Sequence, residues 1–202
     1  MKKLLIPAFL VLPALALAGP VTANNLLTNG SFESDAQGAG SYSVKANLTG
    51  WTGGTHGIEL RNGISGMAYD GKNFIELDTT ANSSMSQSFS TTVGQSYLLS
   101  FVYEQRANNK GADSDGMSWS AGNMSDVAFG QDTITDWTSV NASFVATDTT
   151  TTLTFKALGT SDSIGTSLDA VSVVSAVPEP ASYQLALLGL VACAVALRRR
   201  PR

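Results

Sequence analysis

Short apolar and β-branched runs, separated by Gly, Asn, Asp and Ser, fill the chain from residue 24 to residue 177, and no convincing amphipathic helix interrupts them. Runs of this length with turn residues between them predict strands. Eight or more such strands in one chain indicate an all-β domain, a jelly-roll β-sandwich. The predicted strands are Leu26–Phe32, Gly57–Arg61, Asn73–Asp78, Ser84–Ser90, Tyr97–Arg106, Ser125–Phe129, Trp137–Ala146, Thr151–Leu158 and Ser167–Val174.

Alternation within single runs predicts which strands are covered on one face or on both. Leu153, Phe155 and Ala157 alternate with Thr and Lys, which indicates a strand with one face in the core and one in solvent. Both sets of positions in the run 97–103 are largely apolar, which predicts a central strand. In the run 73–78, Ile75 and Leu77 share one face and the intervening positions share the other.

The first 23 residues have the pattern of a secretory signal. Two lysines precede an uncharged apolar stretch, Leu4–Ala18, and small residues follow at cleavage spacing. Cleavage after Ala23 is favoured over cleavage after Ala18, because the strand pattern begins at residue 24. The alternative is an uncleaved anchor helix, for which the apolar stretch is short.

A second uncharged apolar stretch, residues 181–197, lies close to the C-terminus and predicts a transmembrane helix. Its length is near the lower limit for crossing a bilayer core of about 30 Å. Two prolines just before it mark the helix start, and a basic cluster after it would hold that end on the cytoplasmic side.

These three parts together resemble the PEP-CTERM sorting signal of Gram-negative bacteria. The resemblance implies recognition by an exosortase-type enzyme, passage through the inner membrane, and an anchored stage before delivery to the cell surface or extracellular matrix. It also implies cells that make extracellular polysaccharide, as in a biofilm. An ordinary single-pass anchor is the alternative. The residues that carry the resemblance are Val177, Pro178, Glu179 and Pro180, followed by Arg198, Arg199 and Arg200. The predicted organisation is thus a signal peptide (1–23), a β-sandwich domain (24–176) and a sorting signal (177–202).

Charge and the rare residue types exclude several classes of function. The 202-residue chain carries 12 basic and 16 acidic side chains, and residues 24–177 hold six basic and 15 acidic ones, a net charge of −9. Such a domain repels nucleic acid and attracts cations, including calcium. The single Cys excludes an intramolecular disulfide, and the single His, His56, excludes two-histidine zinc motifs.

Several segments resemble the jelly rolls of the galactose-binding-like superfamily, which include carbohydrate-binding modules of families 4 and 22. The resemblance implies the jelly-roll fold over nearly all of residues 24–175, but it does not by itself give a function. It rests on the opening Asn25–Glu33, the pair Gly50-Trp51, the segments 84–89 and 94–101 as a central hairpin, 137–155 as the penultimate strands, and 168–173 as the closing strand.

The same resemblance implies a structural Ca²⁺ near the two ends of the domain, held by Glu33 and Asp169. Calcium takes six to eight oxygen ligands, which two carboxylates and backbone carbonyls could supply. The alternative is that both carboxylates only accept hydrogen bonds from turn amides. A partial calcium loop at Asp113–Gly116 lacks its first and last ligands and is interpreted as a polar surface loop.

A sugar site requires exposed aromatic rings beside polar side chains. The candidates for such a site are Trp119, Tyr103 and Arg106. Tyr69 and Trp51 are further candidate rings, and the other polar side chains nearby in sequence are Arg61, Glu104 and Gln105. Trp51 and Trp137 are expected to fill the core, whereas for Trp119 a core position and an exposed position are both open.

Catalysis is not expected. Glu59, Glu76 and Glu104 could gather on one sheet face, and two carboxylates at the correct separation can hydrolyse a glycoside, but sequence does not give that separation. His56 has no convincing triad partners. The leading hypothesis is therefore a non-enzymatic exported surface or matrix protein with polysaccharide as its expected ligand. The alternatives are a structural or adhesion component that binds other proteins, and, less favoured, a glycan-acting enzyme.

Overall fold

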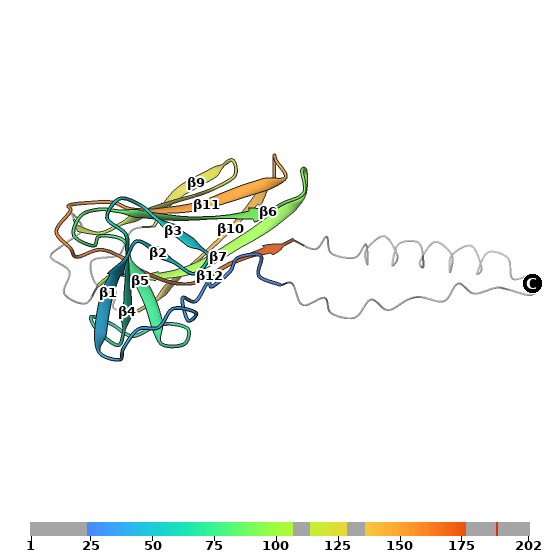
Figure 1. Ribbon diagram of the computed structural model, residues 1–202. Coiled ribbons are helices and arrows are strands. Elements are labelled where there is room, and N and C mark those ends of the chain that lie inside the picture. Colours follow the sequence, from blue (N-terminus) through green and yellow to red (C-terminus); the bar gives the residue numbers. More distant parts are fainter. Residues whose placement is uncertain (1–23, 107–113, 129–135, 177–188, 190–202) are drawn as a thin grey trace, which may run out of the picture.

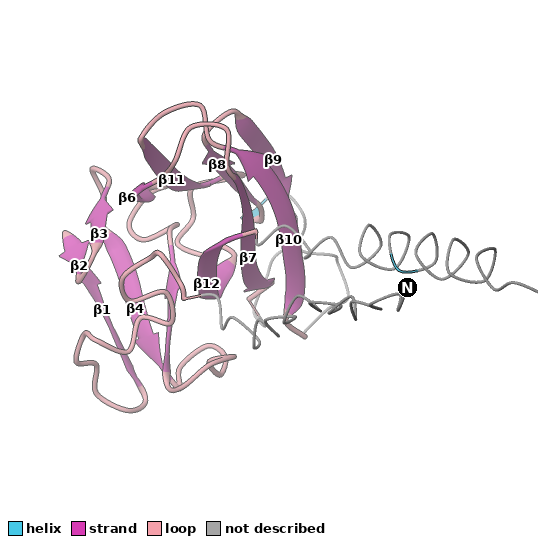
Figure 2. Cartoon of the chain, turned by 90° about the vertical axis from the view of Figure 1, so that its right-hand side faces the viewer, coloured by secondary structure: helices cyan, strands magenta, loops and turns pink. Residues whose placement is uncertain are grey.

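Two six-stranded sheets face each other in the computed structural model, which describes residues 24–106, 114–128, 136–176 and 189 (Figures 1 and 2). Sheet A contains, in spatial order, β1 (Ser41–Lys45), β4 (Ile58–Asn62), β5 (Asn73–Glu76), β12 (Ser167–Ser175), β7 (Ser96–Glu104) and β10 (Thr138–Val145). Sheet B contains β2 (Asn47–Leu48), β3 (Trp51–Gly53), β6 (Ser84–Ser90), β11 (Thr150–Ala157), β8 (Met117–Ala121) and β9 (Met124–Ala128). Neighbouring strands pair antiparallel throughout, so the predicted β-sandwich is confirmed.

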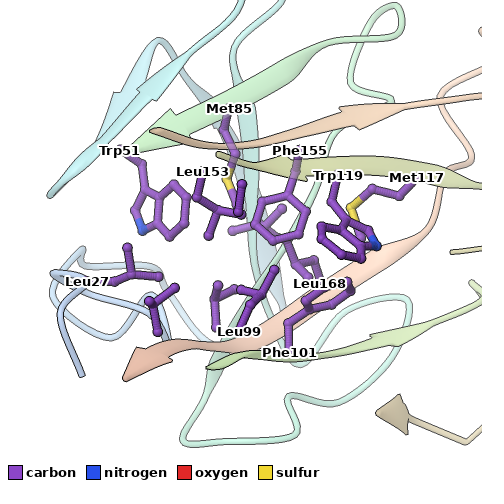
Figure 3. Packing of buried hydrophobic residues seen from close by; sticks show 14 of the residues in the cluster. Leu27, Trp51, Met85, Leu99, Phe101, Met117, Trp119, Leu153, Phe155 and Leu168 are labelled. Carbon is purple, nitrogen blue, oxygen red and sulfur yellow. The ribbon is translucent and has the colours of Figure 1, made fainter. Parts of the chain in front are cut away.

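The core lies between the sheets and is built from the alternate positions that the sequence pattern predicted. Leu153 and Phe155 of β11 are fully buried in it, whereas Thr152 and Lys156 face outward. Figure 3 shows Trp51, Phe155 and Trp119 of sheet B meeting Leu99 and Phe101 of sheet A. The Phe101 ring meets the rings of Phe155 and Trp119 edge to face, at centroid distances of 5.1 and 6.0 Å. These contacts join the two layers by apolar burial.

The predicted first strand, Leu26–Phe32, is wrong. Asn29 and Phe32 have positive φ values of 57° and 62°, which interrupt extended backbone. The segment nevertheless lies beside β12, because the Leu26 amide donates to the Val173 carbonyl and the Val171 amide donates to the Gly30 carbonyl.

Four strands were not predicted: β1, β2, β3 and β8. The first three are short or at the edges of the sheets, and β8 follows a polar segment that suggested a loop. The sequence of β8 does alternate, with Met117, Trp119 and Ala121 buried and the two serines between them partly exposed.

Both ends of the domain lie at one end of the sandwich (Figure 1). Asn25 ties them together, since its side chain donates to the Val171 carbonyl and accepts from the Val173 amide. No helix in the described part of the chain is long and apolar enough to cross a membrane. The predicted signal peptide lies outside the described residues, as does the predicted helix 181–197 except for residue 189.

Candidate functional site

The outer face of sheet A carries buried charged side chains, which is unusual for a surface that no other layer covers. On β4, Glu59 and Arg61 alternate with the core residues Ile58 and Leu60. On β5, Glu76 points to the same outer side, and Glu59 and Glu76 are direct cross-strand partners. Arg61 and Glu76 are 1% and 0% exposed.

Arg61 joins the two carboxylates. Its Nε donates to Glu59 Oε1 at 2.7 Å, and its Nη1 lies 2.6 Å from Glu76 Oε2. The amide of Gly165 donates to Glu76 Oε1 at 2.9 Å. Burial raises the pKa of Glu76 to about 8, although Arg61, the Gly165 amide and Arg106 act to lower it and Glu59 adds to the rise.

Arg106 lies above this cluster and holds two loops together. Its Nη1 donates to the Ser163 carbonyl at 2.7 Å, and its Nη2 donates to Ser65 Oγ at 3.2 Å. Ser65 and Ser163 have positive φ values of 57° and 65°, a conformation that costs a non-glycine residue free energy. Backbone strain at both partners of one arginine is the kind of feature that concentrates at binding sites.

A cleft of about 270 Å³ opens at this point. Beneath it lie the buried charges, and on one side stands Tyr42 of β1, which is 57% exposed. The lining combines an aromatic ring, a carboxylate, a guanidinium and several hydroxyl groups. Its residues are Tyr42, Val44, Glu59, Ser65, Thr79, Thr80, Arg106 and Ser163.

Across the loop 63–70 from this cleft, two aromatic rings lie together. Tyr69 is 57% exposed, and its ring is 6.2 Å from the half-buried ring of Trp137. Trp137 stands edge-on to Phe74 of β5 at 6.0 Å, and its Nε1 donates to the Met67 carbonyl at 3.1 Å. Trp137 was expected in the core, but it covers the outer side of sheet A because Phe74 faces outward from β5.

The structure places the three sequence candidates for a sugar site in different environments, and they do not form one site. Trp119 is 4% exposed and packs on Phe101 inside the sandwich, so its ring offers no face to a ligand (Figure 3). Tyr103 is half-buried and packs against the core. Only Arg106 lines the cleft. Trp51, expected in the core, is there, with its Nε1 donating to the Asn29 carbonyl at 3.0 Å.

Two features of the cleft were missed by sequence reasoning. Tyr42 lies in β1, whose Ser-Tyr-Ser-Val-Lys alternation was a usable signal for a strand, but the apolar side chains of that strand face solvent. Arg61 was not linked to the glutamates. Glu59, Glu76 and Glu104 do lie on one face, since Glu76 and Glu104 both pair with Ser167 of β12.

Glu33 and Asp169 hold a turn at residues 69–73. Asp169 Oδ2 accepts from the amides of Tyr69 and Asp70, both at 2.9 Å, and its Oδ1 accepts from the Ala170 amide. Glu33 Oε1 accepts from the amides of Lys72 and Asn73. Oxygens surrounded by amide hydrogens do not fit a calcium ion, and the described residues contain no group of three or more His, Cys, Asp or Glu that could hold a metal. The calcium site therefore stays a prediction that this geometry does not support.

Two further hollows lie near sheet B. One, of about 300 Å³, includes Trp119 in its lining, but that residue is only 4% exposed there. The rest of its lining is Ser118, Ser120, Ser125, Asp126, Val127, Thr154 and Lys156. The other, of about 390 Å³, lies beside the exposed His56. Neither has an exposed aromatic ring in its lining. The remaining predicted site residues, Val177 to Pro180 and Arg198 to Arg200, lie outside the described residues.

Comparison with known proteins supports both the fold and the C-terminal signal. A family profile described as "Protein of unknown function (DUF642)" matches residues 25–174, and a profile described as "PEP-CTERM protein-sorting motif" matches residues 176–200. No curated protein matches the sequence.

Solved structures share the jelly-roll sandwich at low sequence identity. TmCBM61, solved in complex with β-1,4-galactotriose, is 16% identical with a TM-score of 0.53, covering 76% of this chain and 99% of that one. The arabinose-bound α-L-arabinofuranosidase MgGH51 is 13% identical with a TM-score of 0.53, covering 75% of this chain and 26% of that one. The enzymatically active domain of tailspike protein 4 from bacteriophage CBA120 is 12% identical with a TM-score of 0.50, covering 75% of this chain and 21% of that one. At these identities the likeness shows the fold alone.

Proposed function

Because the chain belongs to the DUF642 family of proteins of unknown function and carries a PEP-CTERM sorting motif, we propose that it is an exported, non-enzymatic protein that binds polysaccharide. The C-terminal motif supports processing by an exosortase-type enzyme at the inner membrane and delivery to the cell surface or extracellular matrix. The jelly-roll fold, which the chain shares with a module solved bound to a galactotriose, supports a saccharide ligand.

The observation that carries the proposal is the cleft on the outer face of sheet A. Saccharide sites combine an aromatic ring, which packs on the apolar face of a sugar, with fixed polar groups that hydrogen-bond its hydroxyls. Tyr42 supplies the exposed ring, and Glu59 and Arg106 supply an acceptor and a donor beside it. The pair Tyr69 and Trp137 offers a second aromatic contact on the same face for a longer chain.

The arrangement of the carboxylates supports the non-enzymatic part. A glycosidase pair acts across a space that holds the scissile bond, at a separation of about 5 Å or more. Here Glu59 and Glu76 are both tied to Arg61, and Glu76 is fully buried. Neither carboxylate is free to protonate or attack a substrate in this arrangement.

Retention of the purified protein in gels containing the extracellular polysaccharide of the producing organism tests the proposal. We expect retention to weaken about tenfold in Tyr42→Ala, which corresponds to ~1.4 kcal/mol. Val127→Ala removes an exposed apolar side chain from the opposite face and is the matched control. No retention of the unaltered protein, or equal loss in both variants, would contradict the proposal.

A further inference from the structure

Of the only two arginines between residues 24 and 176, Arg106 lines the cleft and Arg61 is buried beneath it. This part of the chain is strongly acidic, and its other basic residues are lysines. Arg61 lies in β4 and Arg106 lies two residues after the end of β7, and these two strands are separated in sheet A by β5 and β12. Arg106 is thus the guanidinium group that this acidic domain presents at the opening, and the planar guanidinium fork suits carboxylates better than an ammonium does.

The charge of Arg61 is matched within the protein. Glu59 and Glu76 lie against its Nε and Nη1 at 2.7 and 2.6 Å. Glu59 therefore meets the cleft as one half of a buried ion pair and not as an isolated negative charge. This pairing reduces the repulsion that an anionic ligand would meet at Glu59.

The charge of Arg106 is matched much less well. Its close partners, the Ser163 carbonyl and Ser65 Oγ, are neutral. Among the described residues the nearest carboxylate oxygen, Glu76 Oε1, is 3.7 Å away and already accepts from the Gly165 amide. Its Nε has no hydrogen-bond partner among the described residues.

We propose that the cleft selects an acidic saccharide, and that the carboxylate of a uronic acid residue pairs with Arg106 while the sugar ring packs beside Tyr42. This inference rests on the proposed polysaccharide-binding function and names the ligand class for the same site. Arg106 is 19% exposed and lines the cleft, so a ligand carboxylate reaches it without displacing Glu59 or Glu76. The domain's net negative charge acts against this pairing, and a Debye length of about 8 Å in physiological salt screens the exposed charges that lie further from the cleft.

Calorimetric titration of the purified full chain with oligomers of a hexuronic acid tests the inference. The matched ligand is the carboxyl-reduced form of the same oligomers, which keeps the linkages and hydroxyls but replaces each carboxylate with a neutral alcohol. We expect the acidic form to bind about tenfold more tightly, and this comparison needs no variant. Equal or tighter binding of the reduced form would overturn the uronate assignment and leave the proposed function in place.

Variants of Arg106 locate the preference. We expect Arg106→Gln to reduce the preference for the acidic over the carboxyl-reduced oligomers from about tenfold to below about twofold. Arg106→Lys, which keeps the charge but loses the planar guanidinium fork, should retain part of this preference. Lys156→Gln removes the same charge from the outer face of sheet B and is the control. A preference that persists in Arg106→Gln would contradict the assignment. If neither oligomer binds, gel retention of the protein by the cell's own polysaccharide separates two cases. If the protein is still retained, the uronate assignment alone is wrong. If it is not retained, the proposed polysaccharide-binding function is wrong as well.

Discussion

Glu76 is a carboxyl group buried beneath two loops, and its environment links pH to stability. The group is fully buried, and burial raises its pKa from 4.5 to about 8. A group with a raised folded-state pKa binds a proton more readily in the folded protein than in the unfolded chain. Between pH 4.5 and pH 8 the folded state therefore holds more protons, and the free energy of unfolding falls as the pH rises.

We predict that unaltered protein loses stability between pH 5 and pH 8, and that Glu76→Gln loses less. One group contributes a slope of up to about 1.4 kcal/mol per pH unit. Asp169, whose pKa burial raises to about 7, contributes with the same sign, so the difference between the two proteins isolates Glu76. Urea unfolding at pH 5, 6, 7 and 8 measures it. Parallel curves for the two proteins would show that Glu76 is ionised throughout.

Replacement by alanine is predicted to affect mainly stability at Trp119 and mainly polysaccharide binding at Trp137. Removal of the buried Trp119 ring leaves a cavity against Phe101, so Trp119→Ala should lower the free energy of unfolding by about 3–5 kcal/mol. Trp137 is half-buried on the outer face, and its variant should fold with a smaller loss but bind polysaccharide less tightly. Thermal unfolding and gel retention of both variants check this. Full stability in Trp119→Ala would contradict the core placement.

At the level of elements, the N-terminal segment 25–32 is held by its backbone contacts with β12 and not by membership of a sheet. A Cβ on Gly30 would overlap the Val171 carbonyl oxygen, whose own residue donates its amide to Gly30. Either the backbone at residue 30 or the backbone of β12 at Val171 must then shift.

Gly30→Ala should therefore destabilise the protein by about 1–3 kcal/mol. Gly38→Ala is the control, because a Cβ there meets only the Ser41 hydroxyl at 3.2 Å and the backbone φ is not positive. Chemical unfolding of the two variants provides the comparison. Equal stability would show that the segment moves freely away from β12.

Much of the element order could be predicted from period-two alternation, and the failures have physical causes. β6 (Ser84–Ser90) was predicted with the observed bounds because its inward side chains alternate with four serines. The segment Leu26–Phe32 has strand-like composition, but positive φ values at Asn29 and Phe32 prevent extension. The sequence did not decide between a core and an exposed position for Trp119, because burial of its ring depends on residues of the facing sheet that are distant in the chain.

The candidate site was harder to predict than the fold. The residues that line the cleft come from β1, from β4 and from the segments that follow β4, β5, β7 and β11, and antiparallel pairing brings them together only after the sheet order is known. Alternation sets Glu59 and Glu76 apart from the apolar residues of their own strands, but only the pairing of β4 with β5 places them on one face. The roles of Arg61 and Arg106 depend on tertiary ion pairs and loop contacts, which no spacing in the chain records.

At the scale of the whole molecule, the last residues of β12 and the cleft lie toward opposite ends of the sandwich. Ser175, at the end of β12, pairs with Tyr97, whereas Ser167, at its start, pairs with Glu76 and Glu104. Nine residues of strand separate the two ends by about 26 Å. A chain held at a surface through its tail would thus present the cleft away from that surface.

Immobilisation at defined positions tests this geometry. Cys193 is first replaced so that no other cysteine can react. A bead attached after Ala176 should leave polysaccharide binding within about twofold of that of the free protein. A bead attached to a cysteine in place of Thr80, which lines the cleft, should block binding. Ala176 follows the last residue of the described core, Val173, and Thr80 is exposed, so neither attachment replaces a core side chain. Blocking from the Ala176 attachment would contradict the predicted direction.

The central claim is that saccharide binds on the outer face of sheet A, and the most direct test is to locate it. The measurement is the change in backbone amide NMR shifts of the isotopically labelled protein as polysaccharide fragments are added. The account predicts that the largest changes occur at the residues around the cleft, such as Glu59, Ser65 and Ser163, and that the outer face of sheet B, including Ser118 and Lys156, is unaffected. Changes concentrated on sheet B would contradict the account, as would no change at saturating ligand.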